Sequence, residues 1–440
     1  MSTYPYNLQQ NAAITYPMKS LLVLAGAGTG KTTTIVGRIA HLIQNEKVSL
    51  ESILALTFTN DAANHLKRKL AHEIGEKAHG INACTFHAFA QLFTMKNYIE
   101  LGYSRHPRLM NEGDIYYLIR NRFDELGEMR SRIFRRDHLK AVMVFKKIFE
   151  GFNHNLLTDL ERKSFKRDEL ESLKLIDDER EMERINQLID VVEVFPYYQK
   201  WKKEEDYVDY GDLIINLWDL ISRDGKVCKD LQKQYQHVIV DEFQDNNYAL
   251  SEIVKKIADP ENSIMVVGDD DQCIYAFRQA NIQNIYQFKK YYQINDREHI
   301  TLSNNYRSNQ QILDLANSVI DQNSERLNNK KLIGIKKGNE KPKLLIGSEN
   351  QQLLKMIQMI KILIEKGEDS ENIAILLRSH RKCRLVSNTL IESGIQTSYY
   401  HEKLFEKSVI KDIIALLNIW AFTNKMEHSF LRIIKKFIGI

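Results

Sequence analysis

The chain has 440 residues, of which 43% are hydrophobic and 27% are charged, and its formal net charge is +4. This composition is typical of a globular protein, the length allows about two to four domains, and so small a net charge neither indicates nor excludes a nucleic-acid partner. No apolar run of about 18 residues and no secretory signal is present, which argues against a membrane span and against export. The four cysteines are dispersed without a CxxC pair, which argues against a zinc site or a disulfide framework and favours a reducing cytoplasm.

In chain order, short apolar runs alternate with amphipathic stretches. The first run leads through a glycine-rich turn into a predicted helix over 31–44, and the second precedes a predicted helix over 61–74. The apolar runs that predict buried strands lie at 20–25, 52–58, 237–240 and 263–267, and the last two end in acidic residues. Strands that alternate with helices predict an α/β fold, in which helices cover both faces of a parallel sheet.

The pattern changes between about residues 106 and 205, where the chain is highly charged and almost free of glycine and proline. This segment predicts a helical insertion within the first α/β domain. Its charges favour a solvated helix face, and the alternative is that the basic stretch at 130–140 contacts a nucleic-acid backbone. A second α/β pattern begins near residue 298, with apolar runs at 298–302, 342–346 and 372–377.

A glycine-rich loop follows the first predicted strand, where residues 25–32 read AGAGTGKT. Small residues allow backbone N–H groups to point at a phosphate, the Lys31 ammonium suits the β and γ oxygens, and the Thr32 hydroxyl suits magnesium. The first position departs slightly from the usual pattern, because it is Ala25 rather than glycine. The predicted nucleotide-binding residues of this loop are Ala25, Gly26, Ala27, Gly28, Thr29, Gly30, Lys31, Thr32 and Thr33.

A pair of acidic residues ends the apolar run VIVDEFQD at 238–245. A carboxylate at the end of a buried strand can hold magnesium, which we assign to Asp241 together with Thr32. Glu242 is placed to orient and deprotonate an attacking water, as phosphoryl transfer requires. Acidic residues often end strands for structural reasons alone, and only the accompanying glycine loop makes the catalytic interpretation the stronger one.

Nine stretches, in the same order along nearly the whole chain, resemble superfamily 1A helicases of the UvrD/Rep/PcrA family. They are NLQQNAA (7–13), AGAGTGKT (25–32), LTFTNDAANHLKRKL (56–70), TFHAFA (85–90), DYGDLI (209–214), VDEFQD (240–245), VGDDDQCIYAFRQA (267–280), LSNNYRS (302–308) and IAILLRS (373–379). The resemblance implies an α/β fold with a RecA-like P-loop NTPase sheet flanked by helices, a helical insertion and a second, incomplete RecA-like lobe. The implied domains are a first lobe at 1–105 and 206–290, an insertion at 106–205, part of a second lobe at 291–395, and the start of a second insertion at 396–440.

The resemblance also implies roles around ATP and Mg²⁺. The Gln10 amide would pair with the adenine edge, although from the residues alone a surface glutamine is favoured, and Tyr306 would stack on the adenine. Gln272 would sense the γ-phosphate and couple the ATP site to DNA. Arg307 would reach the γ-phosphate and offset the charge that builds up in the transition state, as an arginine finger does.

A track for single-stranded DNA is indicated by aromatic residues beside polar and basic ones, just after predicted strands. Non-specific binding of single strands combines stacking on aromatic rings with phosphate contacts, and open α/β sheets bind ligands at their carboxyl edge. Packing of these aromatic rings in the core is the alternative, above all for Phe86 and Phe277. The candidate DNA-binding residues are Thr57, Phe58, Asn60, Thr85, Phe86, His87, Tyr275, Phe277 and Arg278.

The leading hypothesis is an ATP-dependent DNA helicase or translocase that moves 3′→5′ on single-stranded DNA and takes a tailed duplex as substrate; the polarity rests on the resemblance alone. The last two motifs of the family's second lobe do not occur, and 397–440 resembles only the start of the second insertion. We therefore expect impaired unwinding by this chain alone, from a disrupted gene product, a partial sequence, or half of a split protein whose partner chain supplies those motifs. The alternative hypothesis is a non-catalytic ATP- and DNA-binding module.

Overall fold

The computed structural model describes residues 6–223, 225–258, 262–275, 280–295, 298–323, 326–327, 329–338, 341–399, 408–421, 429–430 and 433–434. The chain divides into two compact units, Met1–Lys341 and Pro342–Ile440. In the described parts of the chain, no helix combines the length and the apolar character that crossing a membrane requires.

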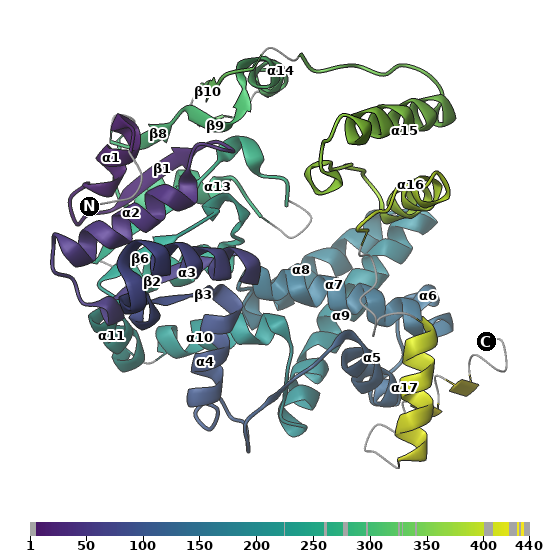
Figure 1. The fold of residues 1–440 in the computed structure, drawn as a ribbon. Helices are drawn as coiled ribbons and strands as arrows, with labels where there is room; N and C mark the ends of the chain where they lie inside the picture. Colours follow the sequence, from purple (N-terminus) through teal and green to yellow (C-terminus); the bar gives the residue numbers. More distant parts are fainter. Residues whose placement is uncertain are drawn as a thin grey trace. The chain divides into compact units, whose positions relative to one another are not determined.

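A six-stranded parallel sheet forms the centre of the first unit (Figure 1). Its strands stand in the order β3-β2-β6-β7-β1-β8, so that β7 lies between β6 and β1. The strands are β1 (Leu21–Ala25), β2 (Ile53–Thr57), β3 (Asn82–Thr85), β6 (His237–Val240), β7 (Ser263–Gly268) and β8 (Ile300–Leu302). The α/β fold predicted from the sequence is confirmed by this sheet.

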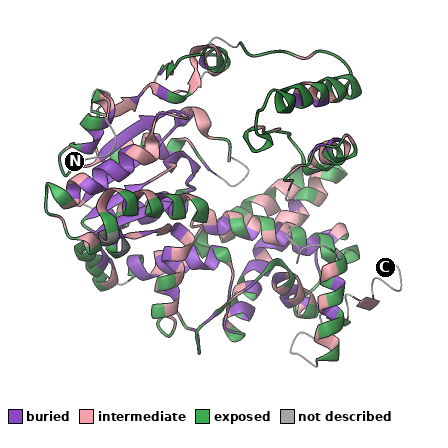
Figure 2. Ribbon diagram, viewed as in Figure 1, coloured by how far each residue is buried: buried purple, intermediate pink, exposed green. Residues whose placement is uncertain are grey.

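The strands of the sheet are largely buried (Figure 2), and an apolar core lies on each of its faces. Along β1, Leu22 and Leu24 join one core while Leu21 and Val23 join the other, because side chains alternate between the faces of a strand. One core adds residues of α4 (Phe86–Lys96), α10 (Tyr210–Arg223), α11 (Gly225–Gln234), α12 (Tyr248–Ala258) and α13 (Gln283–Tyr291). The other adds residues of α1 (Leu8–Ile14), α2 (Lys31–Gln44) and α3 (Asn60–Ile74).

The predicted insertion is helical and has a core of its own, which includes Phe134, Phe145 and Trp201. It comprises α5 (Glu112–Asn121), α6 (Arg132–Arg136), α7 (His138–His154), α8 (Asp159–Ser172) and α9 (Glu179–Glu204). The short parallel pair of β4 (Arg108–Leu109) and β5 (Tyr207–Val208) joins the two ends of the insertion. The chain therefore leaves and re-enters the α/β part at one place.

A buried lysine links the last insertion helix to the segment that follows it. The ammonium of Lys202 lies 2.7 Å from Oδ2 of Asp209 and 2.6 Å from Oδ1 of Asp212, and its side chain is 1% exposed. Burial alone would lower the pKa of Lys202, but the two carboxylates raise it above its ordinary value. Tyr198 of α9 donates a further hydrogen bond to Asp209. This polar network fixes α9 against α10.

After β8, the chain remains in the first unit through β9 (Asn304–Asn309), α14 (Gln310–Ile320) and β10 (Ile333–Lys336), and β10 pairs with β9 in parallel. Because β8 pairs with β1, it completes the first sheet, although the sequence placed the second lobe from residue 291. The boundary between the compact units lies after Lys341. The division into four domains otherwise stays a prediction.

The second unit contains α15 (Glu349–Glu365), α16 (His380–Glu392) and α17 (Ser408–Trp420). A small core that includes Ile360 and Leu390 joins α15 to α16. The strands expected at 342–346 and 372–377 are absent, and that expectation was wrong for this structure. A strand needs a neighbour to bond its backbone groups, and the described residues of this unit contain none.

Replacing Lys202 by alanine will strongly destabilise the first unit, because Asp209 and Asp212 then remain buried without their cation. Removal of one partner from a buried ion pair costs about 3–5 kcal/mol. The free energy of unfolding in urea measures this loss. Lys200→Ala on the same helix is the matched control, because the Lys200 side chain is 70% exposed; equal losses in both variants would contradict the role of the buried network.

Candidate functional site

The glycine loop between β1 and α2 has the conformation that a phosphate cradle requires. Gly28 and Gly30 have φ angles of 74° and 87°, in the left-handed region that favours glycine. Gly30 is the N-cap of α2 and receives no side-chain hydrogen bond, so Lys31 and Thr32 occupy the first turn at the positive end of the helix. The Thr29 hydroxyl donates to the carbonyl of Gly26 and closes the loop. The segment AGAGTGKT therefore has the strand–loop–helix arrangement that the sequence predicted, with a loop geometry that suits an anion.

The end of β6 brings the two predicted acidic residues to this loop. The ammonium of Lys31 lies 2.5 Å from Oε2 of Glu242. Glu242 itself has a φ of 50°, a left-handed conformation that is uncommon for a residue with a side chain. Burial and the charge of Glu242 raise the pKa of Asp241 to about 6, although Lys31 acts in the opposite direction. A carboxylate and the hydroxyl of Thr32 are oxygen ligands that suit Mg²⁺, so these residues fit the ion.

A short hydrogen-bond chain extends from Glu242 to the end of β7. The amide of Gln244 donates to Oε2 of Glu242 over 2.9 Å and accepts from the backbone N–H of Asp269 over 2.9 Å. The amide of Gln272 in turn donates to the carboxylate of Asp269. Gln272 is thereby held by the same turn that contacts Gln244, which gives its predicted coupling role a physical route.

The NYRS segment packs directly on the glycine loop. The amide of Asn305 donates to the carbonyl of Ala27 over 2.5 Å, and the backbone N–H of Tyr306 donates to the carbonyl of Gly28 over 2.9 Å. Asn305 also accepts from the backbone N–H of Arg307, and both Tyr306 and Arg307 are exposed. The structure therefore brings both predicted residues to the loop, with their side chains free of the core.

Gln10 lies beside the loop rather than on the surface. Its side-chain amide donates to the carbonyl of Thr29 over 3.1 Å, and its carbonyl accepts from the backbone N–H of Asn7 in a capping box. Asn7 donates to the hydroxyl of Tyr306. Both polar ends of Gln10 are thus bonded to backbone, which fixes the orientation of the side chain and leaves one amide N–H and one carbonyl lone pair for a ligand.

Two predicted DNA-binding aromatic residues lie together at the carboxyl edge of the sheet. The rings of Phe58, after β2, and Tyr275, after β7, have centroids 5.9 Å apart. Asn60 is exposed at the start of α3, whereas Thr57 is buried and its hydroxyl donates to the carbonyl of Thr59. Phe277 and Arg278 lie outside the described residues.

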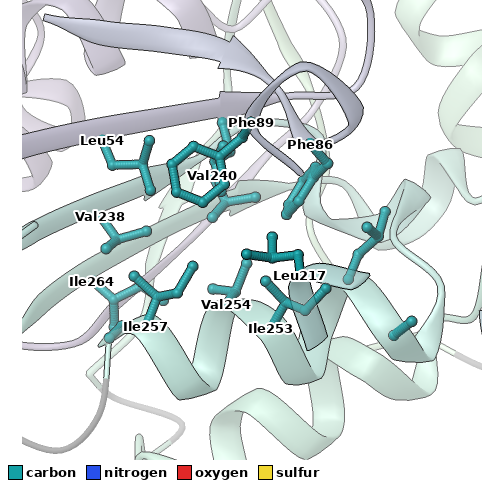
Figure 3. Close-up of a cluster of buried hydrophobic side chains, with 14 of the residues drawn as sticks. Leu54, Phe86, Phe89, Leu217, Val238, Val240, Ile253, Val254, Ile257 and Ile264 are labelled. Atoms are coloured by element: carbon teal, nitrogen blue, oxygen red, sulfur yellow. The ribbon is translucent and has the colours of Figure 1, made fainter. Parts of the chain in front are cut away.

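The three predicted residues around the start of α4 serve the fold. Phe86 is 3% exposed and belongs to the apolar core that also contains Val240 and Leu217, as Figure 3 shows, although it also lines a cavity at the sheet edge. Thr85 is the N-cap of α4. Burial and the neighbouring His154 lower the pKa of His87 to about 4, so this imidazole is neutral at pH 7 and adds no positive charge for a phosphate. The DNA-binding roles of these three residues stay predictions.

A cavity of about 670 Å³ opens between the sheet edge and the insertion. Phe58 and His87 line it on the sheet side, and Glu150, Asn153 and Tyr198 line it on the insertion side. Burial raises the pKa of Glu150. The aromatic and amide groups suit a nucleobase better than a phosphate, because the lining contains several carboxylates.

The fold and the site together define a class. A parallel sheet whose first strand leads through a glycine cradle into a helix, with the acidic end of another strand paired to its lysine, defines a P-loop protein that binds nucleoside triphosphates. A model of the UvrD/REP helicase N-terminal domain matches residues 6–293, and a model of the UvrD-like helicase C-terminal domain matches residues 300–439. The chain belongs to the UvrD/REP helicase family, as the sequence motifs predicted.

Curated relatives of the chain are described as ATP-dependent DNA helicase PcrA. The protein of Staphylococcus epidermidis is 30% identical over 420 residues, which cover 95% of this chain and 54% of the relative. The protein of Staphylococcus aureus is 29% identical over 419 residues, with the same coverage of 95% and 54%. The chain therefore spans about half the length of the curated relatives that it matches.

Sequence reasoning did not single out three residues that hold the site together. They are Asn7, Asn305 and Gln244, which bond to Tyr306, to the glycine loop and to Glu242 respectively. Each lies within a motif quoted from the sequence, but the partners of Asn7 and Asn305 are distant along the chain, and Gln244 also bonds to Asp269, which follows another strand. No local pattern marks such a contact.

Alanine at Gly28 will weaken nucleotide binding by roughly tenfold or more. The left-handed conformation costs a residue with a side chain about 1–3 kcal/mol, and an added Cβ would lie 2.7 Å from Cβ of Arg307 and 2.8 Å from the Asn305 amide. Titration with a fluorescent ATP analogue measures the affinity. Gly127→Ala is the control, because nothing lies within 4 Å of its added Cβ; an unchanged affinity in Gly28→Ala would contradict the cradle.

Proposed function

We propose that this chain binds ATP with Mg²⁺ and hydrolyses it in response to single-stranded DNA, as the motor part of a DNA helicase or translocase. The observation that carries the proposal is the 2.5 Å contact between Lys31 of the glycine loop and Glu242 of the neighbouring acidic strand end. It brings a phosphate-binding cation and a candidate base to one place. The names of the PcrA relatives support DNA as the track and ATP as the fuel.

Each residue of the site has a chemical task in this proposal. The loop from Gly26 to Gly30 and the first turn of α2 bind the phosphates through backbone N–H groups. Thr32 and Asp241 would hold Mg²⁺, which would offset negative charge on the phosphates. ATP displaces the Lys31 ammonium from Glu242 toward the phosphates, which frees the Glu242 carboxylate to accept a proton from water. Arg307 stabilises the charge on the γ-phosphate, and Gln272 reports its presence.

Single-stranded DNA binds at the carboxyl edge of the sheet in this proposal. Phe58 and Tyr275 supply two neighbouring rings for base stacking, and Asn60 is exposed beside them. Movement from 3′ to 5′ and unwinding of a tailed duplex are proposed from the family alone. The four cysteines are dispersed and form no disulfide, which supports a reducing compartment that we propose is the cytoplasm.

Glutamine in place of Glu242 will abolish hydrolysis while binding is retained. Loss of a general base lowers a rate by about 10²–10⁴-fold, and the neutral amide leaves the phosphate cradle intact. Phosphate release with and without single-stranded DNA, together with titration of a fluorescent ATP analogue, measures both properties. Lys31→Ala is the comparison variant, because it removes the phosphate-binding cation and is expected to lose affinity for ATP itself.

Two outcomes of this experiment would contradict the motor. Turnover by the unmodified chain that Glu242→Gln leaves unchanged would show that another residue activates the water. ATP binding by the unmodified chain without any DNA-stimulated turnover would instead indicate a module that binds ATP and DNA but does not hydrolyse.

Alanine at Phe58 will weaken the binding of single-stranded DNA. Loss of one stacking ring costs about 1–3 kcal/mol, or roughly 5- to 150-fold in affinity. Fluorescence anisotropy with a labelled oligothymidine measures the dissociation constant. The control is Phe165→Ala, which removes a partly exposed ring from α8 of the insertion; equal effects of the two changes would contradict a stacking platform at the sheet edge.

A further inference from the structure

Three consecutive carboxylates follow β7, and one lysine lies among them. Oxygen atoms of Asp269, Asp270 and Asp271 lie within 4.8 Å of one another, a spacing at which carboxylates can share a cation. The cation at this place is the ammonium of Lys330, which lies 2.9 Å from Asp269 and 2.7 Å from Asp271 and also pairs with Asp270. Its side chain is 1% exposed. Burial would lower the pKa of Lys330, but these carboxylates raise it above its ordinary value.

The segment that carries Lys330 is fastened to the same turn at two further points. Arg326 donates to both carboxylate oxygens of Asp271, over 2.9 and 3.0 Å, and also bonds to Asp321. The backbone N–H of Leu327 donates to Asp270 over 2.9 Å. A bidentate guanidinium and a backbone donor fix orientation as well as distance. The turn after β7 is thus clamped from outside by residues about sixty positions later in the chain.

The clamped turn is the one that leads to the catalytic side chains. Asp269 accepts from the Gln272 amide through its carboxylate, and it donates through its backbone N–H to Gln244. Gln244 donates to the same Glu242 oxygen that contacts Lys31. A continuous series of contacts therefore joins Lys330 to the candidate base Glu242 through Asp269 and Gln244. Asp269, Gln244 and Glu242 all follow strands of the central sheet, whereas Lys330 lies in a later segment.

The same segment also contacts the glycine loop directly. A Cβ on Gly26 would lie 2.5 Å from a methyl carbon of Leu332, which shows how closely this side chain approaches the loop. Ile333 then begins β10, which pairs with the strand that carries Tyr306 and Arg307. Residues 326–327 and 329–336 therefore join the acidic turn, the phosphate loop and the Arg307 strand.

We propose that Lys330 is a positioning residue for ATP hydrolysis. Its buried ammonium is a counter-ion for the three aspartates and holds their turn, so that Asp269 positions Gln272, the γ-phosphate sensor, and positions Glu242 through Gln244. This inference rests on the proposed ATPase activity. Lys330 touches no substrate in this scheme. It acts through Asp269, and its loss affects the rate of hydrolysis more than the affinity for ATP.

The test replaces Lys330 by methionine, which keeps the length of the side chain and removes its charge. We expect the affinity for a fluorescent ATP analogue to stay within about twofold and DNA-stimulated kcat to fall at least tenfold. The matched control is Lys331→Met, the adjacent residue, whose side chain is 66% exposed and lies 3.5 Å from Asp321. Equal kcat values in the two variants would overturn the proposal, and so would a loss of ATP affinity that accounts for the lower rate.

A second measurement separates charge compensation from packing. Without the ammonium, Asp269, Asp270 and Asp271 face one another, and Arg326 is the cation that still pairs with them among the residues that the structure describes. Their repulsion makes protons bind more tightly in the folded than in the unfolded state, so stability falls as the pH rises. The deficit of Lys330→Met in the urea midpoint is therefore expected to be largest near about pH 8 and to shrink toward about pH 5, while Lys331→Met shows no such trend. A deficit independent of pH would show that only packing was lost.

A compensating change completes the test. Asp270→Asn removes one negative charge at nearly constant shape, so the double variant Lys330→Met/Asp270→Asn is expected to recover part of both the kcat and the stability. Absence of recovery in both would overturn the proposal. If the unmodified chain hydrolyses no ATP at all, the proposed function fails, whereas the pH dependence of stability still decides whether Lys330 neutralises the turn.

Discussion

The ion pair between Lys31 and Glu242 depends on the order of the central sheet more than on either residue alone. The two side chains follow β1 and β6, which are not neighbours, because β7 lies between them. They meet because both strands pair in parallel with β7, with Leu24 opposite Gly268 and Val240 opposite Val266, so that all three end at one edge. Lys31 and Glu242 are thereby held in contact although β7 lies between their strands, and Asp269, which follows β7, is linked to Glu242 through Gln244.

That geometry places the chemistry of the site in one connected set of hydrogen bonds. Glu242 contacts Lys31 on one side and Gln244 on the other, and Gln244 passes the connection to Asp269 at the end of β7. The NYRS segment reaches the same glycine loop from β8 through Asn305. Four strand ends therefore meet around one small volume. Because hydrogen bonds rather than water connect the side chains at these strand ends, a change at one strand end alters the positions of the others.

Much of this arrangement is predictable from the sequence. The remainder is not predictable, because it depends on contacts between segments that are distant along the chain. The glycine loop, the acidic strand end and the helical insertion follow from local patterns, since residue types and spacing determine a cradle, a strand or a charged helix. The burial of Phe86 and the neutral state of His87 depend on what packs on them from β6 and α7. Likewise, the extended apolar run 342–346 becomes a strand only where another strand is beside it, which no single segment specifies.

The short pairing of β4 with β5 has a consequence for how the family can vary. Because Arg108 and Tyr207 lie opposite each other, the two ends of the insertion are adjacent. The residues between them form a separate hydrophobic core. An insertion whose two ends are adjacent can become longer or shorter, or be replaced, without a change in the order of the central strands. The α/β part and the insertion can therefore diverge at different rates, except where contacts join them, such as the Lys202 network and the hydrogen bond from Lys203 to the carbonyl of Leu101.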